Sequence, residues 1–193
     1  MLETLDTKLI EQTLQVLSFE SAFHDPHWRE FVETAYRVCV PLDFYLMPAS
    51  MSGKHHQGYE LGVGGLVRHT KAAMIVAKTL FPLYHYQDHE QDLLMAALAL
   101  HDIAKPSKTH PVEVRPLLEP IENDYYNEIE KVVPLIETHH GQWDCFGKLP
   151  KPRSSKQNFV HLCDYIASRK NIAIDINYQE EKKIGRASCR ERV

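Results

Sequence analysis

The stretch LLMAALALHDIAKP, at residues 93–106, decides how this chain folds. Its eight apolar residues in a row predict a helix that is buried on nearly all sides, and the proline at its end stops that helix. The helix leads into His101 and Asp102, which are costly to bury unless a partner satisfies them. A divalent metal ion would do so, because neutral imidazole and carboxylate both bind such ions. Taken alone, the same pair could equally face solvent at a helix end.

The composition is that of an ordinary soluble protein. With 193 residues, 44% of them apolar and 25% charged, we expect one domain with a core of its own. No apolar stretch has the length of a membrane span, and the N-terminus lacks the pattern of a signal peptide. The four cysteines are scattered without C-x-x-C spacing, which indicates neither a disulfide framework nor a thiolate zinc site. We therefore expect a cytoplasmic protein with no membrane partner.

The last residues, 183–193, differ from the rest of the chain. KIGRASCRERV has no amphipathic period and resembles the translation of a sequencing-adapter read-through, so we expect a non-native tail and a natural chain that continues differently. Residues 1–182 are then one helical domain, with packing helices in 1–44 and a core in 45–170. The tail holds four cations and one anion, so the body is more acidic than the overall net charge of −4. Such a body is a poor nonspecific binder of duplex nucleic acid.

Apolar residues at helical spacing predict an all-helical bundle. The expected helices cover residues 5–18, 26–40, 66–81, 93–102, 121–140 and 155–170. Four prolines between positions 106 and 120 predict a loop of about fifteen residues instead of a helix. Pro134 predicts a kink or a break in its helix, and Gly141 predicts the C-cap. A short strand at 172–176 is the one alternative to helix.

Potential metal ligands recur on four of these helices. They are His69, His101, Asp102, His139, His140 and Asp164. Each one alone is more often structural, but inward-facing histidines and carboxylates on several helices are how bundles build metal centres. The donor types favour Mn²⁺, Fe²⁺, Co²⁺ or Ni²⁺ over Mg²⁺, which prefers oxygen. Asp102 could bridge two ions. Equally compatible is a single ion held by His69, His101, Asp102 and Asp164. His139 or His140 would then orient water or substrate.

Further candidates lie near the expected ligands. Lys105 is placed to meet phosphate oxygens, although a cation at a helix C-terminus also has a purely structural explanation. The Gly-rich loop 46–66 can fold tightly over a site, or be a surface loop. The expected substrate-binding residues come from this loop, the following helix and the basic stretch 148–156, and are His55, His56, Arg68, Lys148, Lys151 and Arg153.

The motifs RHT (68–70) and HDIAK (101–105), together with Asp164, resemble the H…HD…D signature of the HD-domain metal-dependent phosphohydrolases. GGLVRHT (64–70) and THHGQ (138–142) look like the HD domain of bacterial 3′→5′ exoribonucleases. PAS (48–50) with His55 and His56 is similar to HD domains attached to conjugative relaxases. The resemblance covers about residues 45–170. Two departures are Ala104, where a glycine is common, and the two N-terminal helical segments, which cannot form the exoribonucleases' oligonucleotide-binding barrel.

The resemblance implies a phosphohydrolase that acts on a phosphate ester of a nucleotide or of a single-stranded nucleic-acid 3′ end. One or two divalent ions would be held by the six predicted ligands. Asp102, Lys105, His139 and His140 would be the catalytic residues. The alternatives are a nucleotidase for nucleoside monophosphates and a metal-stabilised regulatory module without turnover.

Overall fold

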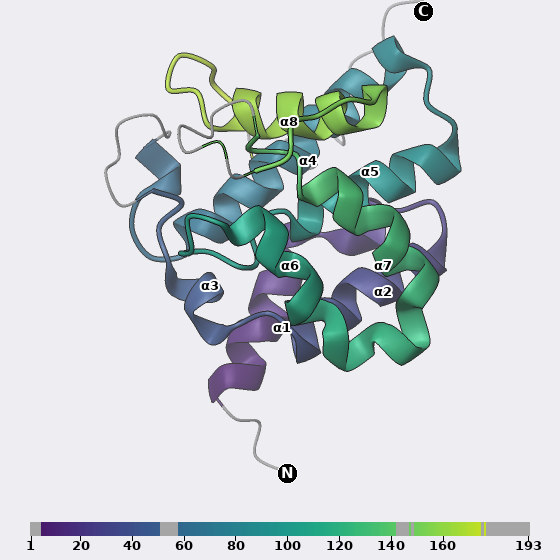
Figure 1. Cartoon of the computed structure of the whole chain (residues 1–193). Coiled ribbons are helices and arrows are strands. Elements are labelled where there is room, and N and C mark those ends of the chain that lie inside the picture. Colours follow the sequence, from purple (N-terminus) through teal and green to yellow (C-terminus); the bar gives the residue numbers. More distant parts are fainter. Residues whose placement is uncertain (1–4, 51–57, 142–146, 148, 175, 177–193) are drawn as a thin grey trace, which may run out of the picture.

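The computed structural model of the chain describes residues 5–50, 58–141, 147, 149–174 and 176, and every regular element within them is a helix (Figure 1). The α-helices are α1 (Leu5–Leu17), α2 (Pro26–Val38), α3 (Leu42–Leu46), α4 (Gly65–Tyr84), α5 (Asp88–Leu100), α6 (His110–Leu118), α7 (Glu122–Ile136) and α8 (Ser155–Ala167). Short 3-10 helices are η1 (Phe19–Ser21), η2 (Gly58–Glu60) and η3 (Glu119–Ile121). The predicted all-helical bundle is confirmed.

Helix α5 forms the centre of the bundle. Each side chain from Leu94 to Leu100 has an exposed fraction of 0%. The helix packs against α2, α4, α7 and α8, which surround it (Figure 1). Because neighbours cover every face, the continuous apolar run has no polar side to present to water. The same burial carries the end of α5, with His101 and Asp102, into the interior.

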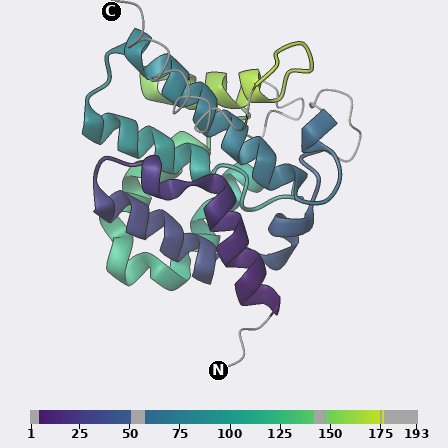
Figure 2. The ribbon, with the colours of Figure 1, turned by 180° about the vertical axis from the view of Figure 1, so that it is seen from behind.

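The N-terminal helices pack against this centre. Helix α1 contacts α4, and α2 contacts α5; both lie below those helices in the view from behind (Figure 2). Asp25 caps α2 by accepting a hydrogen bond from the His27 N–H at 2.9 Å. The Tyr36 hydroxyl donates to the Ala99 carbonyl at 2.7 Å, which fixes α2 to the last turn of α5. This contact holds the helix end that carries His101.

The predicted loop between positions 106 and 120 is wrong, because α6 and η3 occupy most of it. Pro111 lies in the first turn of α6, where its missing N–H would have had no helical partner. Pro116 lies farther along and removes only one helical hydrogen bond. Val114 and Leu118 are fully buried from this helix, and their packing outweighs that loss.

Three smaller predictions around α7 and the C-terminus are also wrong. The kink predicted at Pro134, which lies in the last turn of α7, lies instead at Tyr125, where the backbone angles are non-helical. Glu137 is the C-cap, and Gly141 is needed for a different reason, because a Cβ there would lie 2.0 Å from the Pro150 carbonyl oxygen. Within the described residues of 172–176, the chain forms no strand.

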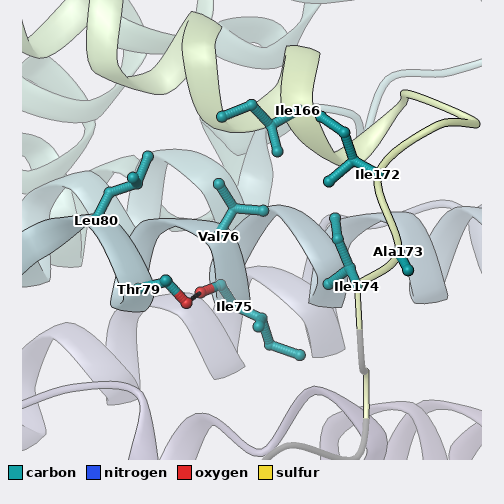
Figure 3. A pocket seen from close by; sticks show the side chains of 8 residues that line it. All are labelled: Ile75, Val76, Thr79, Leu80, Ile166, Ile172, Ala173 and Ile174. Atoms are coloured by element: carbon teal, nitrogen blue, oxygen red, sulfur yellow. Dashed lines mark hydrogen bonds between the residues drawn. The ribbon is translucent and has the colours of Figure 1, made fainter.

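One apolar pocket of about 270 Å³ lies between α4, α8 and residues 172–174 (Figure 3). Val76 and Leu80 of α4 face Ile166 of α8 across it. None of the predicted site residues lines this pocket. Among the described residues, no helix is both long enough and apolar enough to cross a membrane.

Candidate metal centre

The C-terminal end of α5 is the starting point of the site. His101 caps this helix with an exposed fraction of 0%, and Asp102, in the turn that follows, is 2% exposed. A buried imidazole beside a buried carboxylate requires other polar groups close by. Four other helices, or the turns next to them, supply these groups.

The first group of ligand atoms lies between α4, α5 and α8. Oδ1 of Asp164 is 2.9 Å from Nε2 of His69 and 3.7 Å from Nε2 of His101. The two imidazole nitrogens are 3.3 Å apart. Oδ2 of Asp102 is 3.6 Å from the His69 nitrogen and 3.4 Å from the His101 nitrogen. Ligands that share one ion at bonds of roughly 2.1 Å lie about 3 Å apart, so this spacing suits a metal ion.

The second group lies on the other side of Asp102 and consists of its Oδ1 atom, His110 and His139. Nε2 of His110, at the start of α6, is 3.0 Å from Asp102 Oδ1. Nε2 of His139, just after α7, is 3.7 Å from the same oxygen and 3.3 Å from the His110 nitrogen. The donor atoms of this trio could hold an ion, as could those of His69, His101 and Asp102. The two oxygens of one carboxylate therefore face two different sets of imidazoles.

Each imidazole in both groups is oriented by a hydrogen bond at its other nitrogen. Three Nδ1 atoms donate to backbone carbonyls: His101 to Leu98 at 2.7 Å, His110 to Ser107 at 2.8 Å, and His139 to Ile136 at 2.7 Å. Nδ1 of His69 instead donates to Oε1 of Glu60 at 3.0 Å. Because a carbonyl or a carboxylate can only accept, each Nδ1 carries a proton, and each Nε2, the nitrogen that a metal ion would take, points into the centre. This is the arrangement in which proteins present histidine to a metal.

Asp102 itself fits a divalent ion. Its Oδ2 atom is buried and lacks a hydrogen bond of good geometry among the described residues, although the Lys105 ammonium nitrogen lies 2.7 Å away. That ion pair compensates the charge without satisfying the oxygen's directional preference. A set of neutral imidazoles around a shared carboxylate is the donor chemistry that Mn²⁺, Fe²⁺, Co²⁺ and Ni²⁺ accept. The residues present therefore fit the predicted metal.

The first group holds protons strongly when no ion replaces them. Burial alone would lower the pKa of His69, but hydrogen bonds to Asp164 and Glu60 raise it. Burial is likewise overcome at His101, where the charges of Asp102 and Asp164 raise the pKa to about 10. Burial would raise the pKa of each carboxyl, yet nearby His101 holds the pKa of both Asp102 and Asp164 well below its usual range.

The second group behaves in the opposite way. Burial lowers the pKa of His110 and of His139, and hydrogen bonds to Asp102 do not reverse this shift. The neighbouring His140 is half-buried, and burial together with the His139 charge lowers its pKa as well. Its ring centre lies 5.3 Å from that of His110 and 5.3 Å from that of His139. These imidazoles are neutral near pH 7, which is the form that binds metal.

The predicted substrate-binding residues lie in different surroundings. The Arg68 guanidinium donates to the carbonyls of Tyr59, Leu61 and Val63, so it fastens the loop before α4. Lys151 and Arg153 are exposed. The other three, His55, His56 and Lys148, lie outside the described residues. For all six, a role in substrate binding stays a prediction.

Two residues at the centre are missing from the sequence prediction. His110 lies between prolines in a segment interpreted as a loop, yet the Pro111 and Glu113 that follow it are typical of a first helical turn. Glu60 lies in the Gly-rich loop without any periodic pattern around it. Its only signal is the glycine pair at the start of α4: a Cβ on Gly65 would lie 1.9 Å from the Glu60 carbonyl oxygen.

The fold and the site define an all-helical domain whose buried histidines, together with the buried Asp102, could hold divalent ions. The family profile described as HD domain matches residues 66–169, which is more than half of the chain. The chain therefore belongs to the HD domain family, whose members are generally metal-dependent hydrolases, and the resemblance expected from the sequence is confirmed at that level. Neither a search of curated proteins nor a search of solved structures found a match.

Proposed function

We propose that this protein is a phosphohydrolase that uses two divalent ions, one in each ligand group, to hydrolyse a phosphate ester of a nucleotide or of a single-stranded nucleic-acid 3′ end. The observation that carries the proposal is the position of Asp102, whose two oxygens face His69 and His101 on one side and His110 and His139 on the other. Bound ions supply Lewis acidity and a nucleophilic water of lowered pKa. The donor set favours Mn²⁺, Fe²⁺, Co²⁺ or Ni²⁺ over Mg²⁺.

The chain's own residues have distinct roles in this proposal. His69, His101, Asp164 and Asp102 hold the first ion, and His110 and His139 hold the second with Asp102. Lys105, whose Nζ lies 2.7 Å from Asp102, is partly exposed and can meet a phosphate oxygen while it neutralises charge. His140 lies beside the second group and is partly exposed, which suits a residue that orients the substrate.

The test is metal analysis of the purified protein, followed by a substrate panel with added Mn²⁺ and, separately, Mg²⁺. The panel contains nucleoside monophosphates, a dinucleotide, a single-stranded oligonucleotide and a general phosphodiester. The proposal expects two ions per chain and Mn²⁺-dependent turnover of at least one substrate. Stoichiometric metal without hydrolysis of any substrate would favour a regulatory module instead. If the Asp102→Ala variant hydrolysed phosphodiesters at the wild-type rate, the assignment of the site would be contradicted.

Lys151 and Arg153 distinguish a nucleic-acid substrate from a free mononucleotide. Both side chains are exposed in the segment that leads to α8, which also carries the ligand Asp164. If they contact phosphates of a strand, the double alanine variant weakens oligonucleotide binding and lowers the slope of log affinity against log salt by about 1.4 for two contacts. A nucleotidase would be indifferent to both changes. Lys8→Ala, which removes an exposed cation from α1, is the matched control.

A further inference from the structure

Glu60 differs from the other groups that orient the histidines of the centre. Its exposed fraction is 0%, and its Oε1 accepts the hydrogen bond from Nδ1 of His69 at 3.0 Å. The equivalent nitrogens of His101, His110 and His139 each donate to the carbonyl three residues earlier in their own segment. His69 is therefore the only one of these four histidines, all within the described residues, that is oriented by a carboxylate.

The position of His69 in its helix explains why it needs an outside acceptor. His101 and His139 follow the ends of helices, and His110 starts one, so the carbonyls that they use lie in terminal turns outside the regular α-helical ladder. Those of Ser107 and Ile136 accept the backbone N–H of the same histidine at 3.2 and 3.1 Å as well as its Nδ1–H. His69 lies inside α4, where the carbonyl three residues earlier, that of Leu66, belongs to the helical hydrogen-bond ladder and also accepts from the Thr70 hydroxyl at 3.1 Å. No spare carbonyl of its own helix is available for its Nδ1–H group.

The loop that carries Glu60 is built to deliver it to this position. The Ala49 N–H donates to the Glu60 carbonyl at 3.0 Å, and Gly65 lets that carbonyl pass where a Cβ would lie at 1.9 Å. Arg68 holds the carbonyls on both sides, those of Tyr59 and Leu61. A buried carboxylate is costly unless it is paired or hydrogen-bonded. The three contacts that fix the backbone around Glu60 therefore indicate that its carboxylate has a specific role at His69.

We infer that Glu60 is a positioning residue for the first ion, which fixes the ring and tautomer of His69 and makes its Nε2 a stronger metal ligand than a carbonyl-bound histidine. A carboxylate acceptor draws the Nδ1 proton more strongly than a neutral carbonyl and so raises the electron density at the opposite nitrogen. Glu60 lies before residues 66–169, the part of the chain that matches the family profile. The inference rests on the proposed function, because it needs His69 to hold metal.

The test compares metal affinity at the two groups by calorimetry with Mn²⁺ in Glu60→Ala, Glu60→Gln and the wild type. Loss of an orienting partner typically weakens metal binding 10–100-fold, so in Glu60→Ala we expect about that loss at the first ion and an unchanged second ion. Glu60→Gln keeps an acceptor oxygen without the charge and is expected to recover part of the loss. NMR of the metal-free protein gives a separate readout: the Hδ1 proton of His69 exchanges slowly in the wild type and in Glu60→Gln but fast in Glu60→Ala.

Asp92→Asn is the matched control. Asp92 is also a buried carboxylate, 1% exposed, and it accepts the backbone N–H groups of His24 and Asp25 at 2.8 and 2.9 Å. Its replacement is expected to lower the melting temperature and leave both metal affinities unchanged. If Glu60→Ala binds the first Mn²⁺ ion as tightly as the wild type, or if Asp92→Asn loses as much affinity for that ion, the inference about Glu60 is overturned and the proposed function is not. A wild-type protein that binds no Mn²⁺, or a His69→Ala variant that keeps both ions, overturns the proposed function as well.

Discussion

The two ligand groups share Asp102 but are built by different means. The first group takes His69 and Asp164 from the interiors of α4 and α8 and His101 from the end of α5. Carboxylates lie close to its imidazoles: Glu60 and Asp164 contact His69, and Asp102 contacts His101. The second group is assembled at helix ends, where backbone carbonyls orient His110 and His139. The same ligand type therefore has a raised pKa in one group and a lowered pKa in the other. An ion bound by the first group would therefore have to displace protons from its imidazoles, whereas an ion bound by the second group would meet neutral imidazoles.

The largest effect is expected from removal of the shared carboxylate. Asp102→Ala takes one ligand from each group and leaves the Lys105 ammonium without the oxygen that lies 2.7 Å from it. We expect metal content close to zero and hydrolysis at the background rate, measured by elemental analysis and by the substrate panel. Far-ultraviolet circular dichroism checks that the helices persist. One ion retained per chain would mean that Asp102 serves only one group.

Single replacements in each group separate the two ions. His69→Ala is expected to remove the first ion and His110→Ala the second, so each variant keeps one ion per chain. Turnover in both is expected to fall about 100-fold or more, because each ion supplies charge stabilisation that the other cannot replace. Elemental analysis after dialysis measures the retained ion. If both variants lost both ions, the groups would form one cooperative site rather than two.

The pH dependence of binding is expected to differ between the groups. In His110→Ala, which keeps the first group, an incoming ion displaces the proton of His101, whose pKa is raised to about 10. Affinity for Mn²⁺ should therefore rise at least about tenfold per pH unit between roughly pH 6.5 and 8.5, with at least one proton released, because the pKa of His69 in the same group is raised as well. In His69→Ala, which keeps the second group, the lowered pKa values of His110 and His139 leave the imidazoles neutral, so affinity should be flat over this range.

Calorimetry in two buffers of different ionisation enthalpy counts the released protons directly. Equal pH slopes in the two variants would contradict the contrast between the raised pKa values of the first group and the lowered pKa values of the second.

Each group also depends on one glycine that lets a neighbouring backbone approach. A Cβ on Gly65 would lie 1.9 Å from the Glu60 carbonyl oxygen, and one on Gly141 would lie 2.0 Å from the Pro150 carbonyl oxygen. Gly65→Ala should displace the loop that orients His69, and Gly141→Ala the chain next to His139. We expect each to lower stability by about 1–3 kcal/mol, measured by urea unfolding, and to weaken the ion of its own group more than the other. Gly58→Ala, with open space around its Cβ position, is the control.

The sequence predicted all four candidate ligands of the first group and, in the second group, Asp102 and His139 but not His110. His69, His101 and Asp164 could be found because each interrupts an apolar helical pattern, and that pattern survives in the fold. His110 could not be found in the same way, because the prolines around it favoured a loop and the packing of Val114 and Leu118 decides for a helix. A sequence shows the local preference of each residue. The balance between prolines that favour a loop and buried side chains that favour a helix depends on what covers the segment in the fold.

Glu60 and Arg68 illustrate the limit for loops. The position of Glu60 depends on a close approach to Gly65 and on three carbonyls held by Arg68, none of which has a periodic signature. Arg68 stands next to a ligand and carries a charge, which favoured a substrate-binding role in the sequence. In the fold its guanidinium contacts backbone. A charged residue near a site can thus stabilise a loop instead of binding a ligand, and only the folded structure distinguishes these two roles.

The smallest effect is expected at the start of α6, where side chains support the second group indirectly. The hydroxyls of Ser107 and Thr109 donate to Glu113 Oε1, the former at 2.7 Å, and so close the turn whose Ser107 carbonyl orients His110. Glu113→Gln weakens these charge-assisted bonds, which typically lowers stability by about 1 kcal/mol or less at a partly exposed position. We expect the second ion to bind a few-fold more weakly and the first ion to be unaffected, measured by calorimetry at pH 7.5. A larger loss at the first ion would mean that the two groups are coupled through Asp102 more tightly than their separate scaffolds suggest.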